Sequence, residues 1–280
     1  IPRITPDAVM AALRREVVPL DAPLLRFQGR TPPADGDKGL QGAWAEAMAA
    51  PVRPLERKAA ASFGYTDFGQ PGKVVSDVRE PLLGIRTVRF ANGVRLNIKR
   101  TDLKKDQVLV QVSVDGGEML ATREAPLATR MVPVISIGGL GKHSKDELDT
   151  ILAGRTVSAN ISSTDETFVI LAGTNPRDLE LELQLATAQF VDPGYRKEGD
   201  VLFKQTINNL FASLRATPGS ALSAGLGEII SDNDPRFSLG VVENYRVLSF
   251  DKLKGTVGDR FANGAIEIGI VGDVDEEAAI

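Results

Sequence analysis

The side chains that most often carry out enzyme chemistry are scarce in this sequence. It contains one histidine, His143, and no cysteine, which excludes disulfides, thiolate metal sites and cysteine nucleophiles. A catalytic zinc ion usually needs three protein ligands, and one His with scattered carboxylates is a poor substitute for that set. We therefore expect no zinc chemistry on this chain alone, and we predict no catalytic, cofactor-binding or metal-binding residue in it.

A glycine-rich segment, Gly138–His143, resembles a phosphate-binding loop at first sight. A Walker loop needs Gly, four residues and then Gly-Lys-Ser/Thr, whereas here Ser136 stands at the first position and His143 at the last. The segment also follows an expected apolar helix rather than a strand. We interpret it as a flexible helix–helix connection, and His143, just before the expected helix cap Ser144, as a solvated or locally hydrogen-bonded histidine.

Three further patterns have simple structural explanations. Asp232-Asn233-Asp234 has calcium-like oxygen spacing but lacks the twelve-residue frame of a calcium loop, so a turn before Pro235 is expected. Asn160-Ile161-Ser162 matches a glycosylation sequon at the end of an expected strand, which gives it little weight. The acids at 273 and 275–277 are interpreted as the N-terminus of a helix. No Gly-x-Ser-x-Gly elbow is present, which excludes serine hydrolase chemistry of that type.

The composition is that of an ordinary globular protein. Of the 280 residues, 42% are hydrophobic and 25% charged, and the net charge is 33 − 37 = −4, which provides no basic surface for nucleic acid. No stretch approaches the ~20 apolar residues of a membrane span. Neither end has the pattern of a natural terminus, because the first residues lack Met and a signal peptide and the last ones begin a helix. We expect both ends to be cuts in a longer polypeptide.

The first third of the chain alternates between short elements and breaks. Patterns of caps and apolar residues predict a helix over 8–16, a strand over 23–28 and a helix over 40–50. Residues 51–84 are interrupted by Pro and Gly and are predicted to be a linker or an extended surface segment. Its aromatic residues Phe63, Tyr65 and Phe68 could attach it to a domain.

From residue 86 onward the pattern is that of a compact α+β domain. Asn92-Gly93 lies between two apolar runs, which is the strongest short signal for a β-hairpin. Alternation and caps predict strands over 87–90, 94–99, 108–114, 156–161, 166–172 and 265–271, and helices over 126–137, 144–153, 179–190, 196–214, 220–230 and 249–261. Strands joined by short turns predict a mostly antiparallel sheet with helices packed on one face.

Several segments in this order resemble the pitrilysin/insulinase family of zinc peptidases. The opening Phe90–Lys99, continuing through Thr101-Asp102 to Val114-Asp115-Gly116-Gly117, is similar to the start of a domain in that family. The closing Val271–Asp275 resembles the last strand of the domain, and Ser231–Phe237 resembles bacterial members. The resemblance covers residues 86–280, and it implies the metallohydrolase fold of the pitrilysin and mitochondrial processing peptidase type.

The resemblance also implies which half of such a peptidase this chain represents. In the family one half binds zinc through His-x-x-Glu-His on a helix and a Glu on a later helix, and its intervening Glu activates water. The corresponding segment here, 125–134, contains neither His nor Glu, and the later helix has Glu198 at its start but Asn208 and Asn209 in its middle. The substrate-gripping Arg and Tyr of the family belong to a later domain, so no functional residue is carried over.

These implications give a domain assignment and a function. Residues 1–50 would be the C-terminal part of the preceding domain, 51–85 the linker, and 86–280 an inactive domain truncated at its C-terminus. The chain would enclose a peptide substrate for a bacterial zinc metallopeptidase, with zinc and catalysis in a His-x-x-Glu-His half of the same polypeptide or of a partner chain. Periplasmic location is suggested by the family. The alternatives are a non-enzymatic assembly subunit like the core proteins of respiratory complexes, and an unrelated peptide-binding module.

Overall fold

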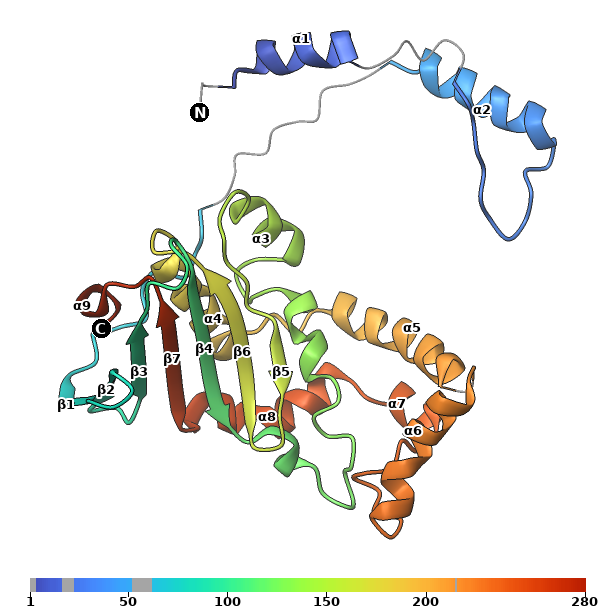
Figure 1. Cartoon of the computed structure of the whole chain (residues 1–280). Coiled ribbons are helices and arrows are strands. Elements are labelled where there is room, and N and C mark those ends of the chain that lie inside the picture. The colour runs from blue at the N-terminus through green and yellow to red at the C-terminus, as the bar shows by residue number, and fades with distance from the viewer. Residues whose placement is uncertain (1–3, 17–22, 52–61, 215) are drawn as a thin grey trace. The chain divides into compact units, whose positions relative to one another are not determined.

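The computed structural model describes residues 4–16, 23–51, 62–214 and 216–280, which form two compact units, Ile1–Lys58 and Ala59–Ile280. The first unit contains α1 (Pro6–Glu16) and α2 (Gly36–Ala49), close to the two predicted helices (Figure 1). The strand predicted over 23–28 is wrong. Leu24 is fully exposed there, and no strand among the described residues pairs with this segment to supply the hydrogen bonds that a strand needs.

A seven-stranded sheet forms the centre of the second unit (Figure 1). Its spatial order is β1-β2-β3-β7-β4-β6-β5. The strands are β1 (Val74–Glu80), β2 (Ile85–Phe90), β3 (Arg95–Arg100), β4 (Val108–Asp115), β5 (Ile161–Ser163), β6 (Thr167–Thr174) and β7 (Ile266–Gly272). Every neighbouring pair is antiparallel except β3 and β7, which are parallel. The predicted α+β class with a mostly antiparallel sheet is confirmed.

Helices cover one face of this sheet. The described helices of the unit are α3 (Lys145–Ile151), α4 (Leu179–Val191), α5 (Lys197–Ser213), α6 (Pro218–Ile230), α7 (Val242–Arg246), α8 (Phe250–Asn263), α9 (Glu276–Ala279) and the 3-10 helices η1 (Gly117–Leu120) and η2 (Val132–Gly138). Of these, α4 contacts β6 and α8 contacts β4. The Phe261 ring of α8 lies edge-on to Phe168 of β6 and to Phe190 of α4, with both ring centroids 5.3 Å away, so one side chain joins the sheet to both helices.

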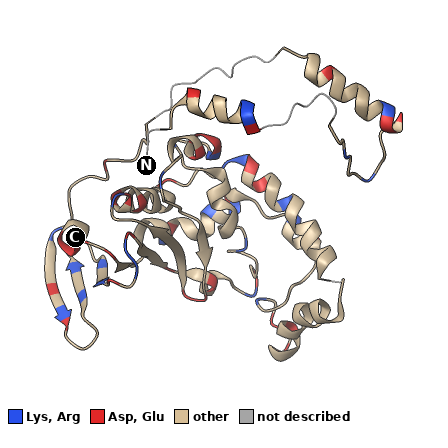
Figure 2. Ribbon diagram, turned by 45° about the horizontal axis from the view of Figure 1, so that its top comes forward, with Lys and Arg blue, Asp and Glu red and all other residues tan. Residues whose placement is uncertain are grey.

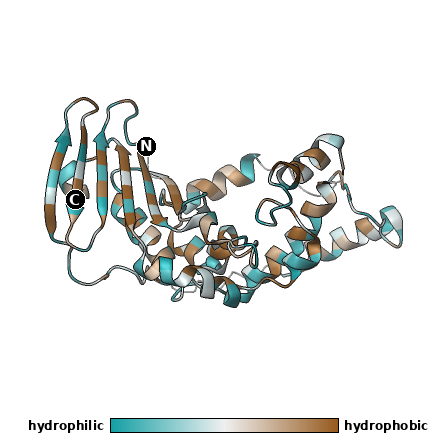
Figure 3. Ribbon diagram, turned by 90° about the horizontal axis from the view of Figure 1, so that it is seen from below, coloured by the Kyte–Doolittle hydropathy of each residue, from teal (hydrophilic) through white to brown (hydrophobic). Residues whose placement is uncertain are grey.

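Successive side chains along a strand point to opposite faces of the sheet, and the two faces of this sheet differ accordingly. Val110, Ile170 and Ile270 point into the core and are almost fully buried, whereas their neighbours Leu109 and Leu171 are more than half exposed. Figure 3 shows the resulting alternation of hydrophobic and hydrophilic colour along the strands. The face opposite the helices is therefore partly apolar.

The segment predicted as a linker contributes structure to the second unit. Tyr65 is buried, Phe68 is exposed, and β1 forms the edge strand of the sheet by pairing with β2, although no strand was predicted there. Acidic and basic residues are interleaved on β1 and β2 (Figure 2), and Arg86 of β2 donates hydrogen bonds to Asp77 of β1. Residues 52–61 of the predicted linker lie outside the described residues.

Two other predicted elements are wrong for identifiable reasons. The helix predicted over 126–137 is replaced by turns and by η2, because Pro126 and Pro133 cannot donate the backbone hydrogen bonds of an α-helix. The strand predicted over 156–161 contributes only its last residue to β5. The backbone N–H groups of Thr156 and Ser158 instead donate to the buried carboxylates of Asp178 and Glu182, both at 2.8 Å.

Candidate functional site

The resemblance matches residues 125–134 to the zinc motif of the family. Residues 125–131 form turns that lead into η2, and Met131, Val132 and Ile135 are buried. The segment therefore presents apolar side chains to the interior, and none of its residues is a metal ligand.

Helix α5, which the resemblance matches to the helix of the last zinc ligand, packs against η2 through apolar groups. Phe203 and Ile207 are its buried side chains, and both belong to the main core. Gly199 permits the close approach, because a Cβ atom there would lie 2.7 Å from the Phe250 ring and 3.1 Å from the carbonyl oxygen of Val134. The residues present at this position do not fit a zinc ion, which needs nitrogen, sulfur or oxygen ligands.

The polar residues of α5 that were weighed as ligands have other contacts. Asn208 accepts a hydrogen bond at 2.8 Å from Arg246 and donates one at 3.3 Å to the carbonyl oxygen of Lys204. Glu198 and Asn209 are exposed. Across residues 4–16, 23–51, 62–214 and 216–280, no group of three or more His, Cys, Asp and Glu side chains is arranged to hold a metal ion.

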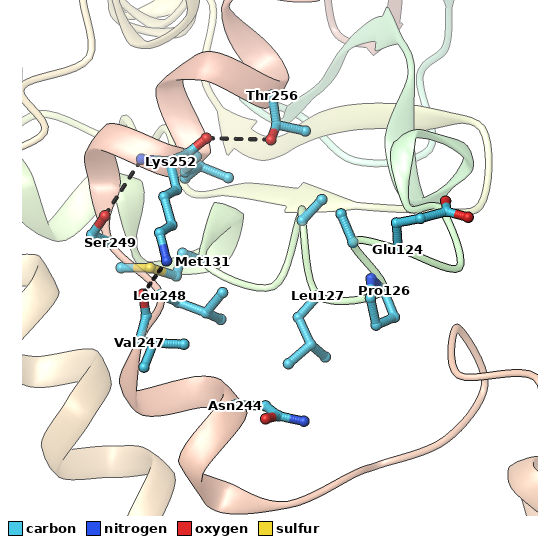
Figure 4. A pocket seen from close by; sticks show the side chains of 13 residues that line it. Glu124, Pro126, Leu127, Met131, Asn244, Val247, Leu248, Ser249, Lys252 and Thr256 are labelled. Carbon is cyan, nitrogen blue, oxygen red and sulfur yellow. Dashed lines mark hydrogen bonds between the residues drawn. The ribbon is translucent and has the colours of Figure 1, made fainter.

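A pocket of about 420 Å³ opens beside the same segment (Figure 4). One wall comes from residues 124–128 and Met131, and the other from residues 244 and 247–249 and the first turns of α8. In Figure 4 the Leu127 side chain extends into the pocket between the two walls. The pocket thus joins two parts of the chain more than a hundred residues apart.

The pocket has a charge at each side. Lys252 belongs to the first turn of α8, and its Nζ donates a hydrogen bond at 2.9 Å to the carbonyl oxygen of Val247. Glu124 lies on the opposite side in Figure 4. Hydrogen bonds from its own backbone N–H and from Thr122 hold the pKa of Glu124 below its usual range, so this carboxylate is ionised at neutral pH. The pocket is therefore apolar at its centre with Lys252 at one side, while the Glu124 carboxylate points away from it in Figure 4.

The glycine-rich segment Gly138–His143 connects η2 to α3, and the side chain of Arg196 holds it in place. Arg196 donates hydrogen bonds to the carbonyl oxygens of Gly138 and Leu140, both at 2.6 Å, and to those of Gly141 and His143, both at 3.0 Å. A phosphate loop presents N–H groups to its ligand, whereas this loop presents carbonyl groups to a guanidinium. The predicted flexibility is therefore not observed.

His143 attaches the segment around Tyr65 to this connection. Its Nε2 accepts a hydrogen bond at 2.8 Å from the backbone N–H of Gly64, and its ring lies 6.0 Å from that of Phe63. The Tyr65 hydroxyl donates at 2.7 Å to Asp192 and accepts from the backbone N–H of Lys142, and burial raises the pKa of Tyr65 to about 12. These contacts hold two segments of the chain together.

The other acidic patterns are occupied by internal contacts. The side-chain hydrogen bonds from Arg236 hold the pKa of Asp234 well below its usual range, and Arg123 lies 3.0 Å from the same carboxylate. Asp275 caps α9, while Glu276 pairs with Arg79 and Glu277 pairs with Arg86. In the sequon, Asn160 precedes β5, and Ile161 and Ser162 belong to it. These are the contacts of turns and caps.

Comparison with known proteins supports the fold and the family resemblance. No family model matches the chain. The chloroplastic stromal processing peptidase of Arabidopsis thaliana is 22% identical over 211 residues, which are 74% of this chain and 17% of the relative. The periplasmic protease PqqL from Escherichia coli superimposes with a TM-score of 0.68 at 14% identity, over 87% of this chain and 27% of PqqL.

A third relative is itself a non-catalytic unit. The peptidase M16 inactive domain from Pseudomonas fluorescens has a TM-score of 0.56 at 15% identity and covers 70% of this chain, which spans 48% of that structure. This chain has the fold of the M16, or pitrilysin, peptidases. The predicted resemblance is thus confirmed, and this chain spans less than a third of PqqL and under a fifth of the stromal peptidase.

The pocket was not predicted from the sequence. Its residues have no common spacing or motif, since Leu127 lies in a turn and Lys252 in a helix that the chain reaches 125 residues later. The only sequence signal at this place was the absence of His and Glu from residues 125–134. Within the described ranges, no helix is both long enough and apolar enough to cross a membrane.

Proposed function

We propose that this chain is a non-catalytic, substrate-enclosing part of a zinc metallopeptidase of the pitrilysin family. The carrying observation is the apolar packing of Met131, Val132, Phe203 and Ile207 at the place of the zinc ligands, within an M16 fold. A wall of this kind contributes surface and volume around a peptide, while hydrolysis needs the half that carries His-x-x-Glu-His. Zinc would be bound in that half.

The assignment of domains belongs to the same proposal. Residues 1–50 would end a preceding domain, 51–85 would connect the halves, and 86–280 would begin the inactive half. The catalytic half would lie in the same polypeptide or in a partner chain of a bacterial peptidase. Periplasmic location is supported by the similarity of the fold to PqqL, which is a periplasmic protease.

The experiment measures zinc content and cleavage of a fluorogenic peptide, first with this chain alone and then after mixing with a His-x-x-Glu-His half. We expect neither stoichiometric zinc nor chelator-sensitive cleavage from the chain alone, and cleavage above that of the isolated catalytic half after mixing. A catalytic half with Gln in place of the motif Glu is the control. Stoichiometric zinc with strong, chelator-sensitive hydrolysis by the chain alone would refute the proposal. A stable complex that leaves cleavage unchanged would favour an assembly subunit.

A further inference from the structure

The pocket beside residues 124–131 has the size and the lining of a ligand site. Its volume of about 420 Å³ lies within the ~300–1,000 Å³ range of small-ligand pockets. Met131 and Leu253, each 2% exposed, are fixed parts of its wall, while Leu127 and Leu248 are half-buried beside the open space. An apolar side chain that entered here would displace water from Leu127 and Leu248, which is favourable.

The cationic end of the pocket requires a second, anionic group on the same ligand. An ammonium group has three donors, and the one hydrogen bond from Lys252 to the Val247 carbonyl leaves two of them for a ligand. Lys252 and Ser249 also belong to the N-terminus of α8, where the helix dipole favours an anion. Lys252 is the only cation among the residues that line the pocket, and Asp251, the other charged residue of this turn, does not line it.

The position of Lys252 fixes the direction in which such a ligand lies. Lys252 is at one side of the pocket, and the Glu124 carboxylate points away from the pocket in Figure 4, so an anionic group is favoured at the side of Lys252. Asn244 lies at the mouth of the pocket (Figure 4), where its amide can pair with a peptide backbone. An Asp or Glu side chain does not satisfy this arrangement, because it would carry its charge into the apolar space. An apolar residue at the C-terminus of a peptide does satisfy it, because it has an apolar side chain and a carboxylate on the same carbon atom.

We propose that this pocket binds the C-terminal residue of a peptide, with its apolar side chain beside Leu127 and Leu248 and its terminal carboxylate at Lys252. The inference deepens the proposed function and rests on it, since it names a peptide end that the non-catalytic wall would hold. Held in this way, a substrate or a cleaved product would be fixed at one end without any chemistry in this chain.

The test is a fluorescence anisotropy titration of the full 280-residue chain with a fluorescein-labelled Gly/Ser peptide that ends in Leu, as the free acid and as the amide. We expect saturable binding of the free acid and binding of the amide weaker by about 10-fold, because the amide loses a charge-assisted hydrogen bond. Lys252→Met should weaken the free acid by the same ~10-fold and leave the amide unchanged. Leu127→Ser should weaken both peptides, because it removes apolar contact from each.

The matched control is Lys254→Met, which removes the next lysine of α8, one that does not line the pocket, and should leave both affinities unchanged. Circular dichroism verifies that each variant folds. Equal affinity for acid and amide, equal effects of the two lysine variants, or no saturable binding at about 1 mM peptide overturns the inference. Displacement of the labelled peptides by decanoate would also overturn the inference. If binding fails while the chain still stimulates the catalytic half, the inference is lost and the proposed function stands.

Discussion

Arg196 is the single side chain on which the connection between η2 and α3 depends most, and its removal gives the clearest prediction. Its guanidinium donates to four backbone carbonyl oxygens, at 2.6 Å to those of Gly138 and Leu140 and at 3.0 Å to those of Gly141 and His143. We predict that Arg196→Met destabilises the chain, whereas a mutation at a comparable but more exposed arginine does not.

The magnitude follows from what each carbonyl group loses. The carbonyl groups of Leu140 and His143 keep a backbone partner, because each also accepts from the N–H of the other residue. That of Gly141 faces solvent, where water replaces the lost bond at about 0.5 kcal/mol. Gly138 is buried, and loss of the bond to its carbonyl oxygen costs about 1–3 kcal/mol. With the weakened bonds at Leu140 and His143, the sum is about 2–4 kcal/mol.

The assay is urea denaturation followed by circular dichroism, with the free energy of unfolding taken at constant slope. In a domain of this size the loss corresponds to a fall in melting temperature of about 10 °C. Arg246→Met is the control, because Arg246 is half exposed and its pairs with Glu243 and Asn208 should contribute less than about 1 kcal/mol. A change below about 0.5 kcal/mol in Arg196→Met would refute the reasoning.

Two further predictions concern the interior. Burial raises the pKa of Glu182 from 4.5 to about 7, so the folded state favours the protonated form of this side chain. The protonated Glu182 therefore contributes its full stabilisation below pH 4.5, and this contribution is lost as the pH rises through 7. The side chain of Glu182→Gln can still accept the hydrogen bond from the Ser158 N–H. We therefore expect this variant to be more stable than the natural chain at pH 8 and similar to it at pH 4.5. Identical pH profiles of the free energy of unfolding would contradict this prediction. Ile207→Ala should lower the free energy of unfolding by about 3 kcal/mol, because it leaves a cavity between α5 and the core. Urea denaturation measures this loss, and Leu210→Ala at an exposed position of the same helix is the control. Equal losses in both variants would contradict the packing argument.

The strongly patterned elements were predictable from sequence because their signals are local. The Asn92-Gly93 hairpin formed as predicted, and Ser144 and Glu147 form the expected capping box at the start of α3. Strand β7 and helix α8 also lie within two residues of their predicted ranges. In each case the residues that specify the element lie within it or next to it in the chain.

The errors occurred where distant groups competed for the backbone. Residues 156–160 have a strand-like sequence, but the carboxylates of Asp178 and Glu182, from the start of α4, take the N–H groups that a strand would use. Strand β1 has mostly exposed side chains, so its sequence carries no period that would reveal it, and it forms because the edge of β2 is available.

The amino-acid sequence by itself determined that the His-x-x-Glu-His motif is absent, because the chain has one His and no second His four residues from it. It also determined the class of the fold, because the strand and helix periods are local. Only the tertiary structure decided what replaces the missing metal site. Packing brings Phe203 and Ile207 against η2, and it brings Lys252 opposite Glu124 across an apolar pocket. Those contacts depend on how α5, α7 and α8 pack against residues 124–138, and the spacing of residues along the chain does not encode that packing.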